Sequence, residues 1–177
     1  MIINDRESDL TSYWVLHGKL LAGEYPGSAD GSSARHRLRW LLDSGITRFI
    51  DLTEPGESGL KSYLSELTDE AAEEGVTVGH TRIPIPDMDV PSSDHMKHIL
   101  DKLDNSINAG ERVYVHCYGG KGRTGTVVGC YLVRHGKSGE DALQQIINLR
   151  KEISRSGEQS PETQEQKDMV REWTTGQ

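Results

Sequence analysis

A short apolar run, a glycine-rich loop and a helical pattern follow one another in the middle of this chain. Val113–His116 has the length and composition of a buried strand, and in residues 124–135 the apolar and aromatic side chains recur at helical spacing. The loop between them contains Gly119, Gly120, Gly122 and Gly125. Glycines open backbone conformations that other residues avoid, so such a loop can turn its N–H groups toward one point at a helix N-terminus. The pattern predicts a phosphate-binding loop between a strand and a helix.

Cys117 and Arg123 lie at the two ends of this loop, with five residues between them. A cysteine attacks as its thiolate, which a helix N-terminus and nearby cations favour. We therefore predict that Cys117 is a nucleophile, largely ionised at neutral pH. Arg123 can donate two parallel N–H bonds to a phosphoryl group, which a lysine cannot match. The predicted substrate-binding residues are Tyr118, Gly119, Gly120, Lys121, Gly122 and Arg123.

The run of residues 116–125 resembles the signature loop of cysteine-dependent protein tyrosine and dual-specificity phosphatases. That motif reads His-Cys, five residues, Arg and then Ser or Thr, and the likeness covers about residues 18–173. The His-Cys-Tyr-Gly-Gly form is similar to the cyclin-dependent-kinase-associated phosphatases. The resemblance implies a phosphotyrosine-phosphatase-like fold and a two-step reaction on a phosphate monoester.

The same resemblance implies a role for each polar residue of the loop. Cys117 would form a phosphocysteine, and Arg123 would bind the phosphoryl group throughout. Thr124 would donate its hydroxyl to the cysteine sulfur and help it leave in the second step. His116 would support the loop by hydrogen bonds rather than act as a base.

The general acid must come from another segment, because a phenolate or alkoxide leaving group needs a proton that the loop does not supply. Asp87 and Asp89 lie in residues 82–91, where three prolines indicate a rigid loop after a strand. Asp87 follows Pro86 and resembles the acid of the Pro-Ile-x-Asp loop in the compact dual-specificity enzymes. We expect Asp87 to be the acid, with Asp89 as the alternative.

A third segment, residues 155–166, resembles the Arg-x-Gly-Ser-x-x-Thr-x-x-Gln segment that follows the signature loop in several such phosphatases. By that likeness Gln166 approaches the site and orients the hydrolytic water. A structural role for Gln166 stays open. Ser160 or Thr163 would cap the last helix ahead of it.

The substrate class is less constrained than the chemistry, because the loop recognises a phosphate monoester and not its carrier. Likeness to the compact enzymes implies phosphotyrosine first, with some activity on phosphoserine and phosphothreonine. A lysine at the place of Lys121 is found in phosphatases of phosphoinositides, so lipid or inositol phosphates are the alternative, although Lys121 could also simply face solvent. A phospho-binding module without turnover is a third hypothesis, against which stand Cys117, Arg123, Thr124 and Asp87.

Composition agrees with one domain over residues 1–177, with its core in about residues 13–174. A net charge of −8 disfavours nucleic acid and anionic membranes as partners, and no apolar run approaches the eighteen or so residues of a membrane span. A phosphorylated protein is the expected partner; the oligomeric state is not readable. Cys117 and Cys130 are too few for a zinc site, and neither a metal nor a cofactor is expected. The first residues lack a secretory pattern, so the cytoplasm is expected.

Alternating patterns predict an α/β fold, in which a mostly parallel twisted sheet is flanked by helices. The predicted strands are residues 14–16, 20–22, 46–52, 76–78 and 113–116, and the predicted helices are residues 35–42, 63–71, 96–107, 124–135, 142–147 and 164–173. Ligands of such sheets bind at the carboxyl ends of the strands, where Cys117 is expected to lie.

Overall fold

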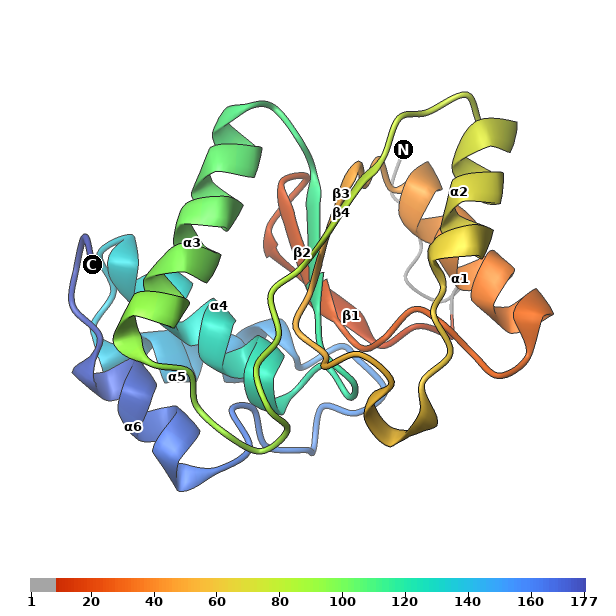
Figure 1. Cartoon of the computed structure of the whole chain (residues 1–177). Helices are drawn as coiled ribbons and strands as arrows, with labels where there is room; N and C mark the ends of the chain where they lie inside the picture. The colour runs from red at the N-terminus through yellow and green to blue at the C-terminus, as the bar shows by residue number, and fades with distance from the viewer. Residues whose placement is uncertain (1–8) are drawn as a thin grey trace.

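The predicted strands form one five-stranded sheet in the computed structural model, which describes residues 9–177 (Figure 1). The strand order is β1-β2-β5-β3-β4, and only the β1–β2 pair is antiparallel. The predicted α/β fold with a mostly parallel sheet is therefore confirmed. Of the predicted domain span of 1–177, residues 1–8 lie outside the described residues.

The elements follow the predicted order along the chain. The strands are β1 (Ser12–Leu16), β2 (Leu20–Gly23), β3 (Arg48–Asp51), β4 (Gly79–Arg82) and β5 (Val113–His116), and a 3₁₀ turn, η1, covers Glu57–Gly59. The helices are α1 (Gly31–Asp43), α2 (Leu64–Glu73), α3 (Ser93–Asn108), α4 (Gly122–Arg134), α5 (Gly139–Leu149) and α6 (Gln164–Glu172). All six predicted helices coincide with these elements.

The strand expected to begin at Val76 and to lead to the acid loop is present as β4, but it begins three residues later, at Gly79. Val76 is largely exposed, and residues 76–78 carry the chain from the end of α2 to the sheet. Gly79 pairs with Arg48 of β3, whose guanidinium occupies the space where a side chain on Gly79 would stand. Glycine is disfavoured in strands, so local preference gave no sign of this start.

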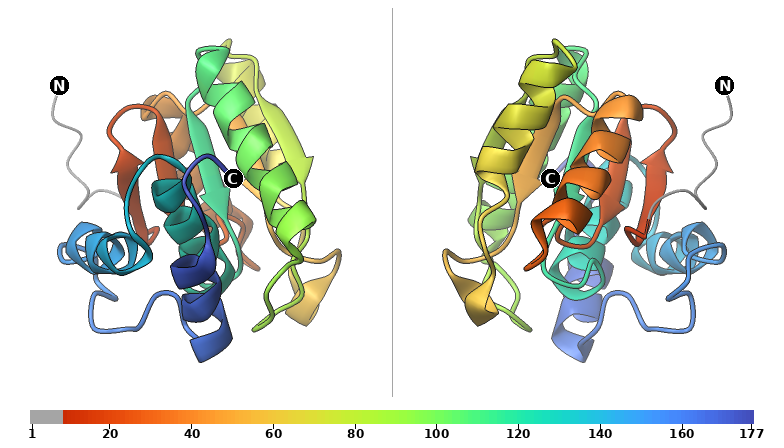
Figure 2. Two further views of the ribbon diagram at one scale, coloured as in Figure 1. Left: turned by 90° about the vertical axis from the view of Figure 1, so that its left-hand side faces the viewer. Right: turned by 90° about the vertical axis from the view of Figure 1, so that its right-hand side faces the viewer.

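Helices cover both faces of the sheet (Figures 1 and 2). One face carries α1 and α2, and the other carries α3, α4, α5 and α6. Two groups of buried side chains fill the space between helices and sheet, one on each face. Burial of this apolar surface is the main favourable contribution to folding.

Strand β5 lies at the centre of the sheet, and all four of its residues are buried. Its last residue, His116, is in register with Gly23 of β2 and with Asp51 of β3. The three strands run parallel, so their carboxyl ends meet at one edge of the sheet. Cys117 follows β5 directly and lies at that edge, where the sequence pattern placed it.

The helices of the described part are too short or too polar to cross a membrane.

Candidate active site

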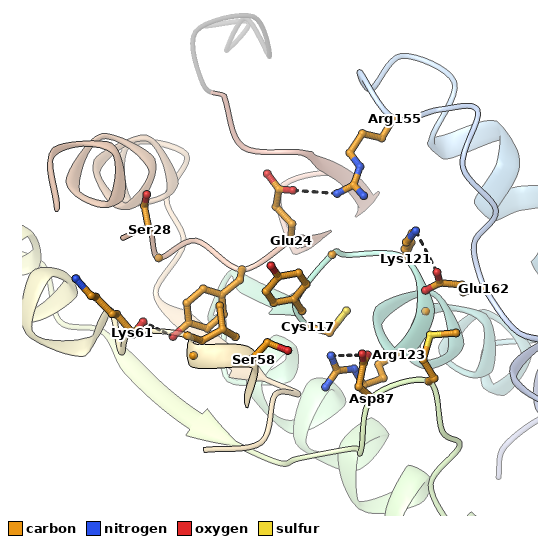
Figure 3. Close-up of a pocket in the computed structure, with 18 of the residues that line it drawn as sticks. Glu24, Ser28, Ser58, Lys61, Asp87, Cys117, Lys121, Arg123, Arg155 and Glu162 are labelled. Carbon is orange, nitrogen blue, oxygen red and sulfur yellow. Dashed lines mark hydrogen bonds and ion pairs between the residues drawn. The ribbon is translucent and has the colours of Figure 1, made fainter. Parts of the chain in front are cut away.

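A pocket of about 650 Å³ opens at the carboxyl edge of the sheet (Figure 3). Cys117 lies at its centre, and Arg123 and Asp87 lie beside it. The predicted nucleophile lies in the loop after β5 and the predicted phosphate ligand at the start of α4, whereas the expected acid comes from the loop after β4, about thirty residues earlier in the sequence. The structure thus brings the three principal predicted residues into one cavity.

The loop after β5 presents the N-terminus of α4 to this pocket. Helix α4 begins at Gly122, and no side chain caps its first turn, whereas Asp30, Ser92 and Ser138 cap α1, α3 and α5. The first N–H groups of a helix have no partner within the helix, and they are well suited to bind a phosphate. The uncapped start of α4 therefore fits the predicted phosphate-binding loop.

Gly120 gives the loop its close contact with the neighbouring strand. Its φ of +68° lies in the left-handed region, and a Cβ there would stand 2.5 Å from the Gly23 carbonyl carbon and 2.6 Å from the Glu24 nitrogen. Nearby, the Tyr25 N–H donates to the Tyr118 carbonyl at 2.9 Å. Main-chain contacts of this kind fix the shape of the loop before any ligand binds.

We expect Gly120→Ala to lower the free energy of unfolding by about 1–3 kcal/mol, because it adds backbone strain and a contact that main-chain atoms cannot relieve. Urea denaturation monitored by tryptophan fluorescence measures the change. Gly119→Ala is the matched control, since a Cβ on Gly119 would meet nothing closer than 3.9 Å. Equal stability of the two variants would contradict this role of Gly120.

Two polar side chains brace the loop from behind. The guanidinium of Arg150, at the end of α5, is buried and donates to the Gly120 carbonyl at 3.2 Å. The Ser160 hydroxyl donates to the Lys121 carbonyl at 2.8 Å. Sequence reasoning missed Arg150, because an arginine at a helix end is usually exposed. The sequence analysis proposed Ser160 only as a helix cap, whereas in the structure its hydroxyl binds the Lys121 carbonyl.

Arg123 is almost completely buried and is held by two acidic residues. Glu57 of η1 binds it through both carboxylate oxygens, each at 2.6 Å, and the Ile85 carbonyl accepts from it at 3.0 Å. Asp87 lies 2.9 Å from the same guanidinium. Burial, the largest single effect, raises the pKa of Glu57, but the hydrogen bonds from Arg123 and from the Glu54 N–H, together with the Arg123 charge, outweigh it and lower that pKa below its ordinary value.

Glu57 is a site residue that sequence reasoning did not single out. It follows the carboxyl end of β3 in the run Glu54-Pro55-Gly56-Glu57, and that position at the ligand-binding edge was the one available signal. Its two bonds set the orientation of the guanidinium. Glu57 therefore acts on the site through Arg123.

The two candidate acids lie in different surroundings. The Asp87 side chain lines the pocket and is 59% exposed, so water and substrate can reach it. The Asp89 carboxylate accepts from the neighbouring Val90 N–H at 2.8 Å, and Asp89 is not among the residues that line the pocket. The geometry favours Asp87, the first choice of the sequence analysis.

His116 is fully buried between aromatic side chains beneath the loop. Its Nδ1 lies 3.3 Å from the Cys117 carbonyl, which can only accept, so Nδ1 carries the proton and Nε2 accepts from the Tyr63 hydroxyl at 2.7 Å. Burial lowers the pKa of His116 to about 4, so the ring is neutral at neutral pH. These contacts fit the supporting role that the resemblance implied.

Thr124 and Gln166 make contacts different from those that the resemblance implied. The Thr124 hydroxyl donates to the Gly23 carbonyl, 3.5 Å away, and its donation to the Cys117 sulfur stays a prediction. Gln166 is buried, and its Nε2 donates to the Asp89 carbonyl at 3.3 Å. Its Oε1 accepts from two main-chain N–H groups at the start of α6, where Thr163 provides the cap. The side chain of Gln166 is thus engaged in joining α6 to the acid loop.

The remaining loop side chains flank the pocket. Tyr118 is 52% exposed at the pocket wall. The Lys121 ammonium lies 3.0 Å from Glu158 and 3.1 Å from Glu162, so it does not simply face solvent. Cys130, within α4, is a free and buried thiol whose pKa burial raises. Across residues 9–177, no three His, Cys, Asp or Glu side chains group closely enough to bind a metal ion.

Comparison with known proteins agrees with this site. In Arabidopsis thaliana, the relative named phosphatidylinositol 3,4,5-trisphosphate 3-phosphatase and protein-tyrosine-phosphatase PTEN1 is 33% identical over 153 residues, which are 85% of this chain and 34% of that protein. The crystal structure of Tk-PTP in the active form matches with a TM-score of 0.68 and 26% identity, covering 92% of this chain and 95% of that one.

A kinase associated phosphatase structure aligns with a TM-score of 0.71 over 96% of this chain and 95% of its own, and at 21% identity this likeness shows the fold alone. A family model described as the DSP-PTPase phosphatase domain of the Swiss Army Knife protein, PTP-SAK, matches residues 11–171. The predicted resemblance is confirmed, and the chain belongs to this family of DSP-PTPase phosphatase domains.

Proposed function

We propose that this protein is a phosphatase that hydrolyses phosphotyrosine, with lower activity on phosphoserine and phosphothreonine, through a phosphocysteine intermediate. The observation that carries the proposal is the meeting of Cys117, Arg123 and Asp87 in one pocket at the start of α4. A nucleophile, an anion ligand and a proton donor are the three groups that this reaction needs.

The bonds of Arg123 define where the phosphoryl group would bind. Two N–H bonds of the guanidinium go to Glu57 and one goes to the Ile85 carbonyl, which leaves the N–H of Nε and the N–H of Nη2 that faces Asp87. These two form a fork that matches two phosphoryl oxygens. A phosphate that binds there displaces the Asp87 carboxylate from Arg123, and Asp87 is then free to turn to the leaving oxygen.

The first step transfers the phosphoryl group to Cys117. Once phosphate has displaced it from Arg123, Asp87 takes up a proton from solvent. The thiolate sulfur then attacks phosphorus as the bond to the phenolic oxygen breaks, and Asp87 gives that proton to the departing oxygen. Arg123 and the N–H groups of the loop stabilise the charge on the three equatorial oxygens. The phenol leaves neutral, and the sulfur is bonded to phosphorus.

The second step releases phosphate. A water molecule attacks the phosphocysteine, and Asp87, now a carboxylate, accepts the proton of that water. The phosphorus–sulfur bond breaks, and the electron pair returns to sulfur as the thiolate. The Thr124 hydroxyl, which borders the loop, would turn from the Gly23 carbonyl toward the sulfur at this stage.

The test is the pH dependence of kcat/KM for a phosphotyrosine peptide with the intact protein and Asp87→Asn. We expect the variant to lose about 10²-fold or more, because a general acid contributes on the order of 10²–10⁴-fold. The pH profile of the variant should differ in shape from that of the intact protein, because the variant has no side chain at this position that can donate a proton. Asp89→Asn is the matched control and should keep both rate and profile. A large loss in Asp89→Asn, with little loss in Asp87→Asn, would make Asp89 the acid.

Hydrolysis of phosphoinositides or inositol phosphates is the second candidate function. Two observations favour it: the Lys121 side chain lines the pocket, although two carboxylates pair with it, and the Arabidopsis relative is named as a phosphatase of both lipid and protein. Phosphate release from a phosphotyrosine peptide and from a soluble inositol phosphate at equal concentrations compares the two. A protein that binds the phosphopeptide without releasing phosphate would instead be a binding module.

A further inference from the structure

One wall of the pocket pairs its cations with carboxylates. Lys121 lies 3.0 Å from Glu158 and 3.1 Å from Glu162, and Arg155 lies 2.7 Å from Glu158 and 3.4 Å from Glu24. These five residues, which we call the paired wall, carry three negative and two positive charges, so their net charge is −1. The positive charges of Lys121 and Arg155 are therefore offset by carboxylates.

Four residues of the paired wall, Glu24, Lys121, Arg155 and Glu162, line the pocket beside the phosphate-binding loop (Figure 3). The fifth, Glu158, is not a lining residue, but it binds both Lys121 and Arg155. Lys121 is part of that loop, and a Glu162 carboxylate oxygen lies 3.1 Å from where a Cβ on Gly122 would be. Glu162 is held there because its own N–H donates to the buried Gln166 side chain at 3.0 Å. The Lys121 backbone is held in turn by the Ser160 hydroxyl. Hydrogen bonds to the main chain of Glu162 and of Lys121 therefore hold the two residues next to each other.

A second phosphate on a substrate would meet this wall unfavourably. The ammonium of Lys121 is the cation that such a group would approach from the loop, and two carboxylates already pair with it and offset its charge. A phosphate that approached this ammonium would come close to Glu162, which lines the pocket, and to Glu158, which lies 3.0 Å from the same nitrogen. Bringing like charges together is a common way for a protein to reject a wrong ligand. The aromatic side of the pocket, with Tyr25 and Tyr118, presents no such conflict to a phenyl ring.

We propose that Glu158 and Glu162 determine the specificity of this site: by neutralising Lys121 they select substrates with a single phosphate and reject those that carry a second phosphate beside the first. This inference rests on the proposed function and names its substrate class, a singly phosphorylated aromatic monoester. It also assigns Lys121 to joining the loop to the segment before α6.

The experiment compares two substrates, a phosphotyrosine peptide and soluble inositol 1,3,4,5-tetrakisphosphate. The readout is the ratio of kcat/KM for the inositol phosphate to kcat/KM for the peptide. In Glu158→Gln/Glu162→Gln the ratio should rise about tenfold or more, since a freed ammonium can make a charge-assisted hydrogen bond to the second phosphate. Adding Lys121→Met to that variant should cancel the rise.

Glu152→Gln/Glu165→Gln is the matched control for charge. Both residues are exposed and lie outside the paired wall, so their replacement changes the net charge by the same two units without touching that wall. The ratio for this control should equal that of the intact protein. A rise in this control as large as that of Glu158→Gln/Glu162→Gln would show that long-range charge, and not the paired wall, sets the ratio.

Two results overturn the inference: an unchanged ratio in a Glu158→Gln/Glu162→Gln protein whose thermal unfolding is cooperative, or an intact protein that prefers the tetrakisphosphate. A failure of the proposed function looks different, because the intact protein would then release no phosphate from the peptide. In that case calorimetric binding of the same inositol phosphate to Cys117→Ser, with and without the two glutamine substitutions, still tests the selection. Binding that is equally tight in both forms would overturn it.

Discussion

Cys117→Ser should abolish phosphate release from p-nitrophenyl phosphate, with a loss on the order of 10⁴-fold or more. A serine hydroxyl holds its proton far more tightly than a thiol, so it needs a base that removes that proton. The nearest histidine, His116, cannot supply one, because its Nδ1 faces the Cys117 carbonyl and its Nε2 is paired with Tyr63. The loop would still bind phosphate, since its N–H groups and Arg123 are unchanged.

The measurement is the initial rate at saturating substrate, together with calorimetric binding of a phosphotyrosine peptide to the variant. Cys130→Ala is the control, because it removes the other cysteine from a buried position within α4. That variant should be less stable but should keep its turnover. Turnover that survives in Cys117→Ser would mean that the reaction does not pass through this sulfur.

Arg123→Lys should lower kcat/KM for the same substrate by about 10³-fold, although the charge is kept. The guanidinium makes three hydrogen bonds to Glu57 and Ile85 and still has two N–H groups for the phosphate. An ammonium has three donors, so it cannot hold Glu57 and the Ile85 carbonyl and also present a planar fork to a phosphoryl group. Steady-state kinetics at the pH optimum measure the loss.

Arg48→Lys provides the matched control for that result. Arg48 binds Glu111 through both carboxylate oxygens, at 2.6 and 3.0 Å, much as Arg123 binds Glu57, but Arg48 begins β3 and is not among the residues that line the pocket. Its replacement should lower stability slightly and leave turnover intact. If Arg123→Lys keeps more than about a tenth of the activity, the positive charge alone binds the phosphate, and the two N–H groups on Nε and Nη2 of Arg123 are not needed as a pair.

Local patterns determined much of the site in advance. Strand β5, its loop and helix α4 follow one another without a gap, so apolar periodicity and glycine placement predict them together. The acid loop is also a local signal, because its prolines restrict the backbone and Asp87 follows them directly. The carboxyl-edge position of Cys117 then follows from the parallel sheet.

Contacts between segments far apart in the sequence decided the rest. Glu57 and Arg123 are 66 residues apart, and Arg150 and Gly120 are 30 apart, so no spacing rule connects either pair. The start of β4 at Gly79 also depends on a distant segment, because pairing with Arg48 of β3 fixes it and local strand preference does not.

The sequence by itself determined the class of fold, and it predicts the nucleophile and its phosphate-binding loop, since each depends on residues that are neighbours in the chain. Only the tertiary structure decided which carboxylate orients Arg123, that Asp87 rather than Asp89 lines the pocket, and that Lys121 is neutralised. The physical reason is that the strength of an ion pair or a hydrogen bond depends on distances and burial, which the folded chain alone sets.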